Sequence, residues 1–237
     1  MTPVVELSAV IKEDRGLRPL RIDHLAIEPG EQLAVLGIDR PAAEGLINLV
    51  TGATLPDRGD IRVFGRSTAA IQDSTEWLAF VDRFGLVTER AVLLDMLSVV
   101  QNLAVPFSLD IEPPGGDLRA RAVALALEVG LDEAVWDRRV ANLDITSRAK
   151  IRLGRALALD PSVVLFEHPS AGVPRAEIGA LGRHMRAVVE RRGVAAVTLT
   201  ADGDFAAAVA ERVLTLDPST GRLAEPRPRW LTRLRKG

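Results

Sequence analysis

The chain contains no cysteine and no tyrosine, and its first aromatic residue other than histidine is Phe64. The absence of cysteine excludes disulfides, thiolate metal ligands and cysteine nucleophiles. No run of 18 apolar residues occurs, so no transmembrane helix is predicted. Residues 1–12 do not follow the pattern of a signal peptide. A net charge of −2 gives no strong field toward nucleic acid or anionic membrane. We therefore expect a cytoplasmic protein with no nucleic-acid partner.

What the chain does have is an ordinary globular composition and alternating strand and helix patterns. Its 237 residues, 47% hydrophobic and 26% charged, suffice for one large α/β domain or two small ones. Apolar runs at 32–37 and 162–166 predict buried strands. Further strands are predicted at 4–11, 20–27, 61–64, 194–200 and 212–216, helices at 43–50 and 176–192, and a turn at 57–60. The stretch 92–159 has a helical pattern, broken by a loop at 112–116. The order predicts a layered α/β fold with a helical insertion.

Five segments, in order, resemble the ATP-binding-cassette family over about residues 4–221. They read PGEQLAVLG, LINLVTG, GDIRVFGR, LSVVQNLAVPF and GRALALDPSVVLFEHPSAG. The resemblance implies an α/β, P-loop-NTPase-like fold with a mixed sheet core, an antiparallel β region and an inserted helical subdomain. It implies a single domain over 1–237, with core parts 1–90 and 160–221, a helical subdomain at about 91–159 and a basic tail at 222–237. The stretch VVQNLAVPF is similar to the branch that serves lipoprotein release and lipid trafficking.

The phosphate-loop position departs from the family pattern Gly-x-x-x-x-Gly-Lys-Ser/Thr. In that pattern, glycines let backbone N–H groups face phosphates, the lysine meets their charge and the hydroxyl holds Mg²⁺. Here Ala42 stands at the second glycine, Ala43 at the lysine and Glu44 at the hydroxyl, between Gly37 and Gly45. The loss of all three groups predicts weak or absent binding of ATP and Mg²⁺, the cofactors that the resemblance implies.

Charged residues at the same position suggest what replaces the phosphate. Pro41 has no N–H to donate. We expect Glu44 in the first turn of the helix with Asp39 nearby, so that the protein's own negative charge fills the anion site. Arg40 is the only substitute cation that the pattern offers, and it is either a phosphate ligand or a solvated loop residue. The family's adenine-stacking aromatic is missing as well, since no aromatic ring precedes Phe64.

The signature and Q-loop positions are altered too. Glu89 matches the Q-loop glutamine, where it either binds a water or Mg²⁺ or is a surface residue. The signature Leu-Ser-Gly-Gly-Gln reads Leu143, Asp144, Ile145, Thr146, Ser147. In the family this segment meets the γ-phosphate held by the opposite subunit. Asp144 would repel that phosphate, and we expect Thr146 and Ser147 to cap the next helix instead.

The Walker B strand ends in Glu167 and His168, where the family has Asp-Glu. Glu167 keeps a carboxylate that is a weak candidate for a Mg²⁺ ligand. His168 replaces the residue that polarises attacking water; it is either a proton acceptor or a structural histidine. Ala201 stands at the switch-histidine position and Pro174 at the D-loop aspartate. The sequence therefore assigns no catalytic residue.

These changes favour a non-catalytic, pseudo-ATPase subunit that partners a membrane permease. It would form a homodimer, or a heterodimer with a catalytic cassette subunit, peripherally at the inner face of the plasma membrane. One alternative is a weak ATPase that uses Arg40, Glu167 and His168; another is a stand-alone scaffold module. The basic tail is either solvated or a contact for lipid headgroups or a partner. His24 and His184 are expected to be structural.

Overall fold

The computed structural model describes residues 2–13, 19–217, 220 and 222–225. Most of the basic tail lies outside the described residues, so its two interpretations stay predictions. None of the helices in the described part of the chain combines the length and the apolar character that a membrane span requires.

One mixed sheet runs through the molecule. Among the described residues it has ten strands, in the order β5–β4–β1–β2–β10–β9–β3–β8–β7–β6. The strands are β1 Val5–Lys12, β2 Leu20–Ile27, β3 Gln32–Leu36, β4 Arg58–Val63, β5 Arg66–Ser67, β6 Phe84–Val87, β7 Val163–Glu167, β8 Ala195–Thr200, β9 Arg212–Asp217 and β10 Arg222–Ala224.

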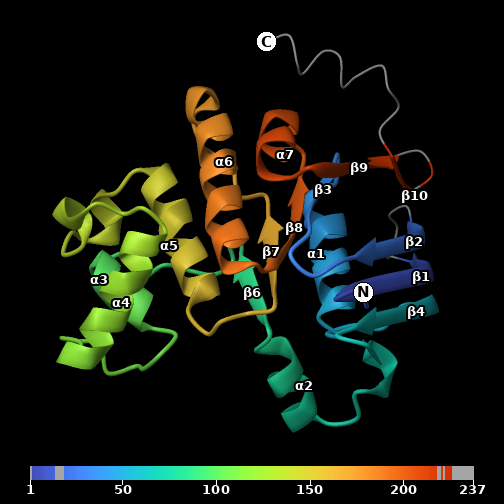
Figure 1. Cartoon of the computed structure of the whole chain (residues 1–237), viewed down its shortest axis with the longest axis horizontal. Helices are drawn as coiled ribbons and strands as arrows, with labels where there is room; N and C mark the ends of the chain where they lie inside the picture. Colours follow the sequence, from blue (N-terminus) through green and yellow to red (C-terminus); the bar gives the residue numbers. More distant parts are fainter. Residues whose placement is uncertain (1, 14–18, 218–219, 221, 226–237) are drawn as a thin grey trace.

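The two halves of the sheet differ in direction. Strand β1 pairs antiparallel with β2 and β4, which gives the antiparallel region on the right of Figure 1. Strands β6, β7, β8, β3 and β9 pair parallel with one another in that order, whereas β9 pairs antiparallel with β10 on its other side. The carboxyl ends of parallel strands meet at one edge of a sheet, which is where α/β proteins usually place their ligands. The loops that follow β3, β6, β7 and β8 therefore gather along one edge.

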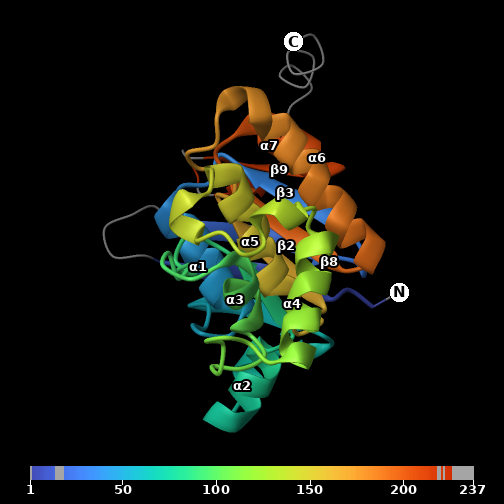
Figure 2. The same cartoon turned by 90° about the vertical axis from the view of Figure 1, so that its left-hand side faces the viewer.

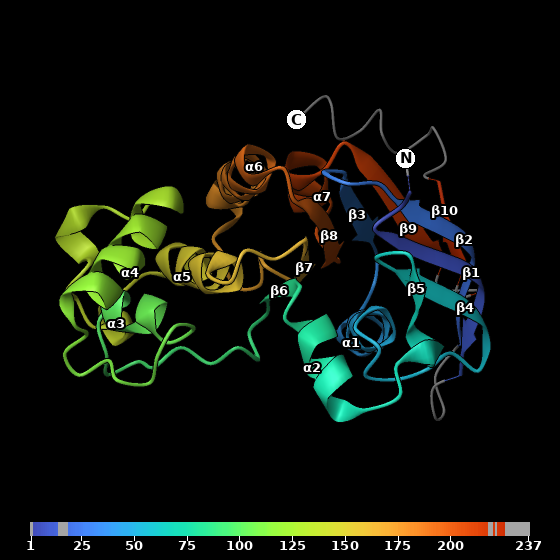
Figure 3. The same cartoon turned by 60° about the horizontal axis from the view of Figure 1, so that its bottom comes forward.

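Helices cover both faces of the parallel strands. The helices of the described residues are α1 Arg40–Val50, α2 Ser74–Val81, α3 Val99–Ala104, α4 Gly116–Glu128, α5 Ile145–Leu157, α6 Arg175–Arg192 and α7 Gly203–Val209, with short 3₁₀ turns η1 Thr68–Ala70, η2 Glu133–Val135 and η3 Val140–Asn142. Figure 3 shows α1 on one side of β3, β7 and β8, and α6 and α7 on the other. Alternate residues face the two layers: Leu33 and Val35 pack with α1, whereas Ala34 packs with α6 and α7.

Helices α3, α4 and α5 form a separate lobe beside the sheet, at the left of Figure 1 and in front in Figure 2. Its apolar side chains belong to the same buried cluster as those of α6 and one face of the parallel strands. On α6, Arg192 binds Glu128 of α4 through Nε and Nη2, both at 2.6 Å. The lobe is the inserted helical subdomain that the sequence predicts, and apolar packing and ion pairs join it to the core.

Several predicted boundaries need correction. The helix predicted at 43–50 begins at Arg40, and residues 58–60, predicted as a turn, open strand β4. The stretch 92–159 has more breaks than the one predicted, because loops also separate α3, α4 and α5. Helices α2 and α7 and strands β5, β6 and β10 were not predicted. They are short, with eight residues or fewer each, so periodicity over a long window does not reveal them.

Candidate functional site

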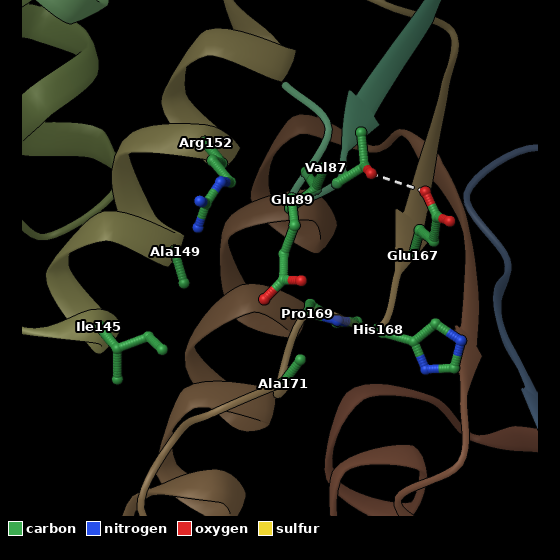
Figure 4. Close-up of a pocket in the computed structure, with 10 residues that line it drawn as sticks. Val87, Glu89, Ile145, Ala149, Arg152, Glu167, His168, Pro169 and Ala171 are labelled. Carbon is green, nitrogen blue, oxygen red and sulfur yellow. Dashed lines mark hydrogen bonds between the residues drawn. The ribbon is translucent and has the colours of Figure 1, made fainter. Parts of the chain in front are cut away.

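The predicted signature residues lie at the start of α5, and the predicted phosphate-loop, Q-loop and Walker B residues lie at the carboxyl ends of the parallel strands β3, β6 and β7. There a small pocket, of about 10 Å³, opens between the core and the helical subdomain. This is the space of about one water molecule. Its lining comes from the end of β6, from α5 and from the end of β7: Val87, Thr88, Glu89, Ile145, Ala149, Arg152, Glu167, His168, Pro169 and Ala171 (Figure 4).

At the phosphate-loop position, the start of α1 is closed by its own N-cap. Asp39 accepts a hydrogen bond from the Ala42 N–H through Oδ1, at 2.9 Å, and another from the Ala43 N–H through its carbonyl oxygen, also at 2.9 Å. Pro41 has no N–H to offer. Backbone N–H groups at a helix start are what usually bind an anion. Of these groups, the Ala42 N–H is occupied by the Asp39 carboxylate, whereas the Ala43 bond is the first regular backbone bond of the helix.

The side chains on α1 do not rebuild a phosphate loop. Gly37 keeps a left-handed backbone, with φ of +81°, and Gly45 lies within the helix. Ala43, at the lysine position, is fully buried. The expectation that Glu44 sits in the first turn is wrong: the helix begins at Arg40, so Glu44 is its fifth residue. The Glu44 side chain is half exposed and pairs with Arg90.

Glu167, at the end of β7, is a buried carboxylate with a fixed set of donors. Its side chain is 9% exposed. Oε2 accepts hydrogen bonds from Thr88 Oγ1 at 2.6 Å, and from Arg90 Nη2 at 2.8 Å and Nε at 3.2 Å. Figure 4 shows the Thr88 bond across the end of the strand. A buried carboxylate needs such partners, because charge is costly to remove from water.

Arg90 also reaches the phosphate-loop helix, since its Nη1 forms an ion pair with Glu44 Oε1. Beside it, Arg40 Nη2 pairs with Glu89 Oε2 at 2.8 Å. The sequence pattern offered Arg40 as the only substitute cation, but Arg90 lies at this edge as well. Arg40 itself is paired with Glu89, the residue at the Q-loop position. The sequence reasoning missed Arg90. The sequence signal that could have identified Arg90 is its place directly after Glu89, together with an acid, Glu44, at the hydroxyl position.

The remaining Walker B and switch positions carry no assembled catalytic group. His168 has a left-handed backbone, with φ of +45°, and its N–H donates to the Leu199 carbonyl at 2.8 Å. Its Nε2 is buried and has no hydrogen-bond partner, and in Figure 4 the ring points away from α5. Ala201 is an exposed residue after β8, and Pro174 directly precedes α6. His168 directly follows Glu167 in the sequence, but within the described part of the chain its ring has no hydrogen bond to a second candidate catalytic residue.

The signature position is a helix start. The expectation that Thr146 and Ser147 cap the helix is wrong, because both lie inside α5 and Asp144 is the cap. Asp144 Oδ1 accepts from the Ser147 N–H at 2.7 Å, and Oδ2 from the Ser147 hydroxyl at 2.9 Å. The backbone hydrogen bond from Ser147 lowers the pKa of Asp144 below its ordinary value of 3.8. The carboxylate that replaces the signature serine is thus engaged locally.

The apolar and hydroxyl residues of the signature also find partners within the chain. Leu143 and Ile145 pack against the larger buried cluster. Ile145 Cδ1 lies so close to Gly172 that a Cβ on that glycine would be 2.7 Å away. Thr146 Oγ1 donates to Glu177 Oε2 on α6 at 2.6 Å.

The other two histidines stand apart from this edge. His184 on α6 lies 2.8 Å, through Nε2, from the carbonyl oxygen of Val129, the residue that ends α4. Burial lowers the pKa of His184 below 6.5. His24 is an exposed residue of β2. Both remain without a role in the candidate site.

Comparison with known proteins adds the family. No protein-family model matches the chain. The lipoprotein-releasing system ATP-binding protein LolD of Alcanivorax borkumensis is 26% identical over 210 residues, which cover 87% of this chain and 91% of LolD. The sulfate/thiosulfate import ATP-binding protein CysA of Caulobacter vibrioides is 30% identical over 205 residues, which cover 85% of this chain and 58% of CysA. These relatives are named for different transport systems, so they do not indicate one branch of the ATP-binding-cassette proteins.

Solved structures agree on the fold. The structure of cbiO1 from Clostridium perfringens, described as part of the ABC transporter complex cbiONQ, matches with a TM-score of 0.82 at 16% identity and covers 100% of this chain and 93% of cbiO1. A dimeric ATP-binding cassette bound to ADP and Pi matches with a TM-score of 0.73 at 21% identity, over 94% of this chain and 99% of that one. At these identities the structures establish the fold alone. Together with the sequence relatives, they show that the chain belongs to the ATP-binding-cassette family of transporter ATP-binding subunits.

Proposed function

We propose that this chain is a non-catalytic cassette subunit, a pseudo-ATPase that acts as a structural or regulatory partner of a membrane permease, of an active cassette subunit, or of both. The observation that carries the proposal is the ion pairing at the nucleotide edge. Arg90 bridges Glu44 and Glu167, and Arg40 pairs with Glu89. The positions that handle phosphate and Mg²⁺ in the family are bound to one another here.

The charge balance of this edge opposes a polyphosphate. Glu44, Glu89 and Glu167 supply three carboxylates against the guanidinium groups of Arg40, Arg90 and Arg152, the last of which lines the pocket beside Glu89. Asp39 adds a fourth acid, and its carboxylate accepts from the Ala42 N–H at the helix start. Phosphoryl transfer depends almost wholly on positioning and on positive charge around the transferred group. The residues present therefore do not fit ATP and Mg²⁺, and we infer weak or absent binding of both.

The loop after Glu89 supports docking on a permease. Its apolar side chains are exposed, at 69% for Val92, 41% for Leu94 and 66% for Met96. The backbone beneath them is held: Arg155 Nη1 donates to the Val92 carbonyl at 2.8 Å, and Asn102 binds both the N–H and the carbonyl of Leu94, at 2.8 and 3.0 Å. A fixed apolar loop is a suitable protein-binding surface. Docking there would place the chain peripherally at the inner face of the plasma membrane.

Pairing with a second cassette follows from the same assignment. In a mixed pair, Asp144 would face ATP held by the catalytic partner and repel its γ-phosphate. Such a pair would have at most one competent site, so transport would depend on the partner's turnover. In a homodimer neither site would be competent, and the dimer would serve as a scaffold.

Thermal unfolding of the purified chain, with and without millimolar Mg-ATP, tests the proposal. A ligand at 100 times its dissociation constant stabilises by about 2.7 kcal/mol, which raises the unfolding midpoint by several degrees. We expect no shift. A Mg²⁺-dependent shift that Arg40→Ala abolishes would instead support a weak ATPase. Affinity capture of the tagged chain from membranes should retain a permease; its absence would favour the stand-alone scaffold.

A further inference from the structure

A single guanidinium joins the two positions that would share a metal ion. In the pattern that the chain resembles, the phosphate-loop hydroxyl and the Walker B carboxylate hold Mg²⁺, and here those positions are Glu44 and Glu167. Arg90 Nη1 pairs with Glu44 Oε1, while Nη2 and Nε both bind Glu167 Oε2. The cation thus contacts a carboxylate on α1 and another at the end of β7.

The burial of Glu167 shows why a cation is needed there. Its side chain is 9% exposed, and besides Arg90 its one other donor among the described residues is the Thr88 hydroxyl, at 2.6 Å. A neutral hydroxyl does not balance a buried negative charge, whereas a guanidinium does, and its rigid fork suits carboxylates. Among the described residues, no three acidic or imidazole side chains are arranged to hold a metal ion. The cation that contacts Glu167 is the Arg90 guanidinium, which is part of the chain itself.

We propose that Arg90 is a tethered cation that takes the place of a divalent metal between Glu44 and Glu167. The comparison with a metal rests on the proposed function, because it uses the assignment of both positions to a former nucleotide site. Guanidinium stays protonated at all ordinary pH values, and its local concentration does not depend on free Mg²⁺. The loop from Thr88 to Met96 is therefore fastened to the core without metal or nucleotide, and the apolar surface of Val92, Leu94 and Met96 is presented constitutively.

The test is thermal unfolding of the full chain without nucleotide, in EDTA, in millimolar Mg²⁺ and in millimolar Ca²⁺. The wild type should unfold at one temperature in all three. Arg90→Met should unfold lower in EDTA by roughly 4–10 °C, because Glu167 loses its cation. Ca²⁺, which tolerates irregular oxygen ligands, should restore part of that loss. The double variant Arg90→Met/Glu167→Gln should unfold above Arg90→Met in EDTA and should not respond to either ion.

Two results would overturn the proposal. One is a wild type that Mg²⁺ or Ca²⁺ alone stabilises, which would mean that Arg90 does not occupy the cation position. The other is an Arg90→Met chain that unfolds at the wild-type temperature and ignores both ions. If Arg90→Met fails to fold in EDTA, Arg90→Lys keeps the charge without the fork. It should fold with an intermediate midpoint and no response to metal.

Failure of this proposal and failure of the proposed function give different signals. A wild-type response to Mg²⁺ without nucleotide counts against the tethered cation. A wild-type response that appears only with Mg-ATP counts against the pseudo-ATPase assignment. Hydrogen exchange of residues 88–98 adds a readout of the loop itself: protection in EDTA should be high in the wild type and lower in Arg90→Met.

Discussion

Two regions lack the family's nucleotide-binding groups: the carboxyl edge of the parallel strands, with the phosphate-loop and Walker B positions, and the signature position at the start of α5. The residues that replace those groups are held in different ways in the two regions. At the edge, side chains far apart in sequence pair with one another: Arg90 with Glu167 and Glu44, and Arg40 with Glu89. At the signature, Asp144 bonds to Ser147, three residues along the same helix. One region depends on tertiary structure and the other on a helix cap.

The residues at the carboxyl edge depend on one another for their stability, whereas Asp144 at the signature position depends only on its own helix. A glutamate at the hydroxyl position and a glutamate at the Walker B position would leave two carboxylates facing each other without Arg90. The aspartate at the signature needs only the helix that it begins, since caps act within one turn. Coupling between residues should therefore be strong at the edge and weak at the signature.

The largest effect is expected from Arg90→Met. The substitution leaves Glu167 buried with one neutral donor, and we expect a loss of roughly 2–3 kcal/mol in the free energy of unfolding. This is below the range of about 3–5 kcal/mol for a fully buried pair, since Arg90 is half exposed. Denaturant unfolding measures it, and Glu167→Gln in the same chain should recover part of the loss. A cost under about 0.5 kcal/mol would contradict the bridge and remove the contrast with the signature.

Asp144→Ala should cost about 1 kcal/mol, the usual value of an N-cap. The measurement is again denaturant unfolding, with Asp144→Asn as a control that can still cap. Combined with Arg90→Met, the losses should add to within about 0.5 kcal/mol, because the two sites share no hydrogen-bond partner. A larger coupling would show that the two regions respond as one.

The pH dependence of that cap gives a sharper comparison. The pKa of Asp144 is lowered in the folded chain, so the unfolded chain binds the proton first as pH falls. Its contribution is therefore complete above the ordinary value of 3.8 and disappears as pH falls through the lower folded pKa. The difference in stability between the wild type and Asp144→Ala should be constant near neutral pH and shrink in acid. A stability difference that instead grew in acid would contradict a lowered pKa of Asp144 in the folded chain.

The smallest effect is expected from Arg40→Met. Its partner Glu89 and Arg40 itself are 42% and 64% exposed, and such surface pairs contribute about 0–1 kcal/mol. High salt should remove whatever contribution remains in the wild type. Denaturant midpoints in low and high salt measure it. A loss in the free energy of unfolding as large as that of Arg90→Met would show that the Arg40–Glu89 pair depends on the ion pairs of Arg90.

Much of the fold could be predicted from sequence because its signals are local. The apolar runs at 32–37 and 162–166 are the buried strands β3 and β7, and Gly193 ends α6 in a left-handed conformation, with φ of +64°. The short elements α2, β5, β6, α7 and β10 could not be predicted, because their sequences carry too few periods to stand out. The residues at the motif positions were found by resemblance, but their partners were not.

The order of amino acids alone shows that the phosphate loop has no lysine or hydroxyl, that the switch position is an alanine, and that the order of strands and helices is α/β. Which side chains occupy the carboxyl edge follows from the three-dimensional fold. Arg90 and Glu167 are 77 residues apart, and they meet because β6 and β7 pair in parallel and end side by side. An ion pair depends on a distance of a few ångströms, and folding alone sets that distance for residues so far apart in the chain.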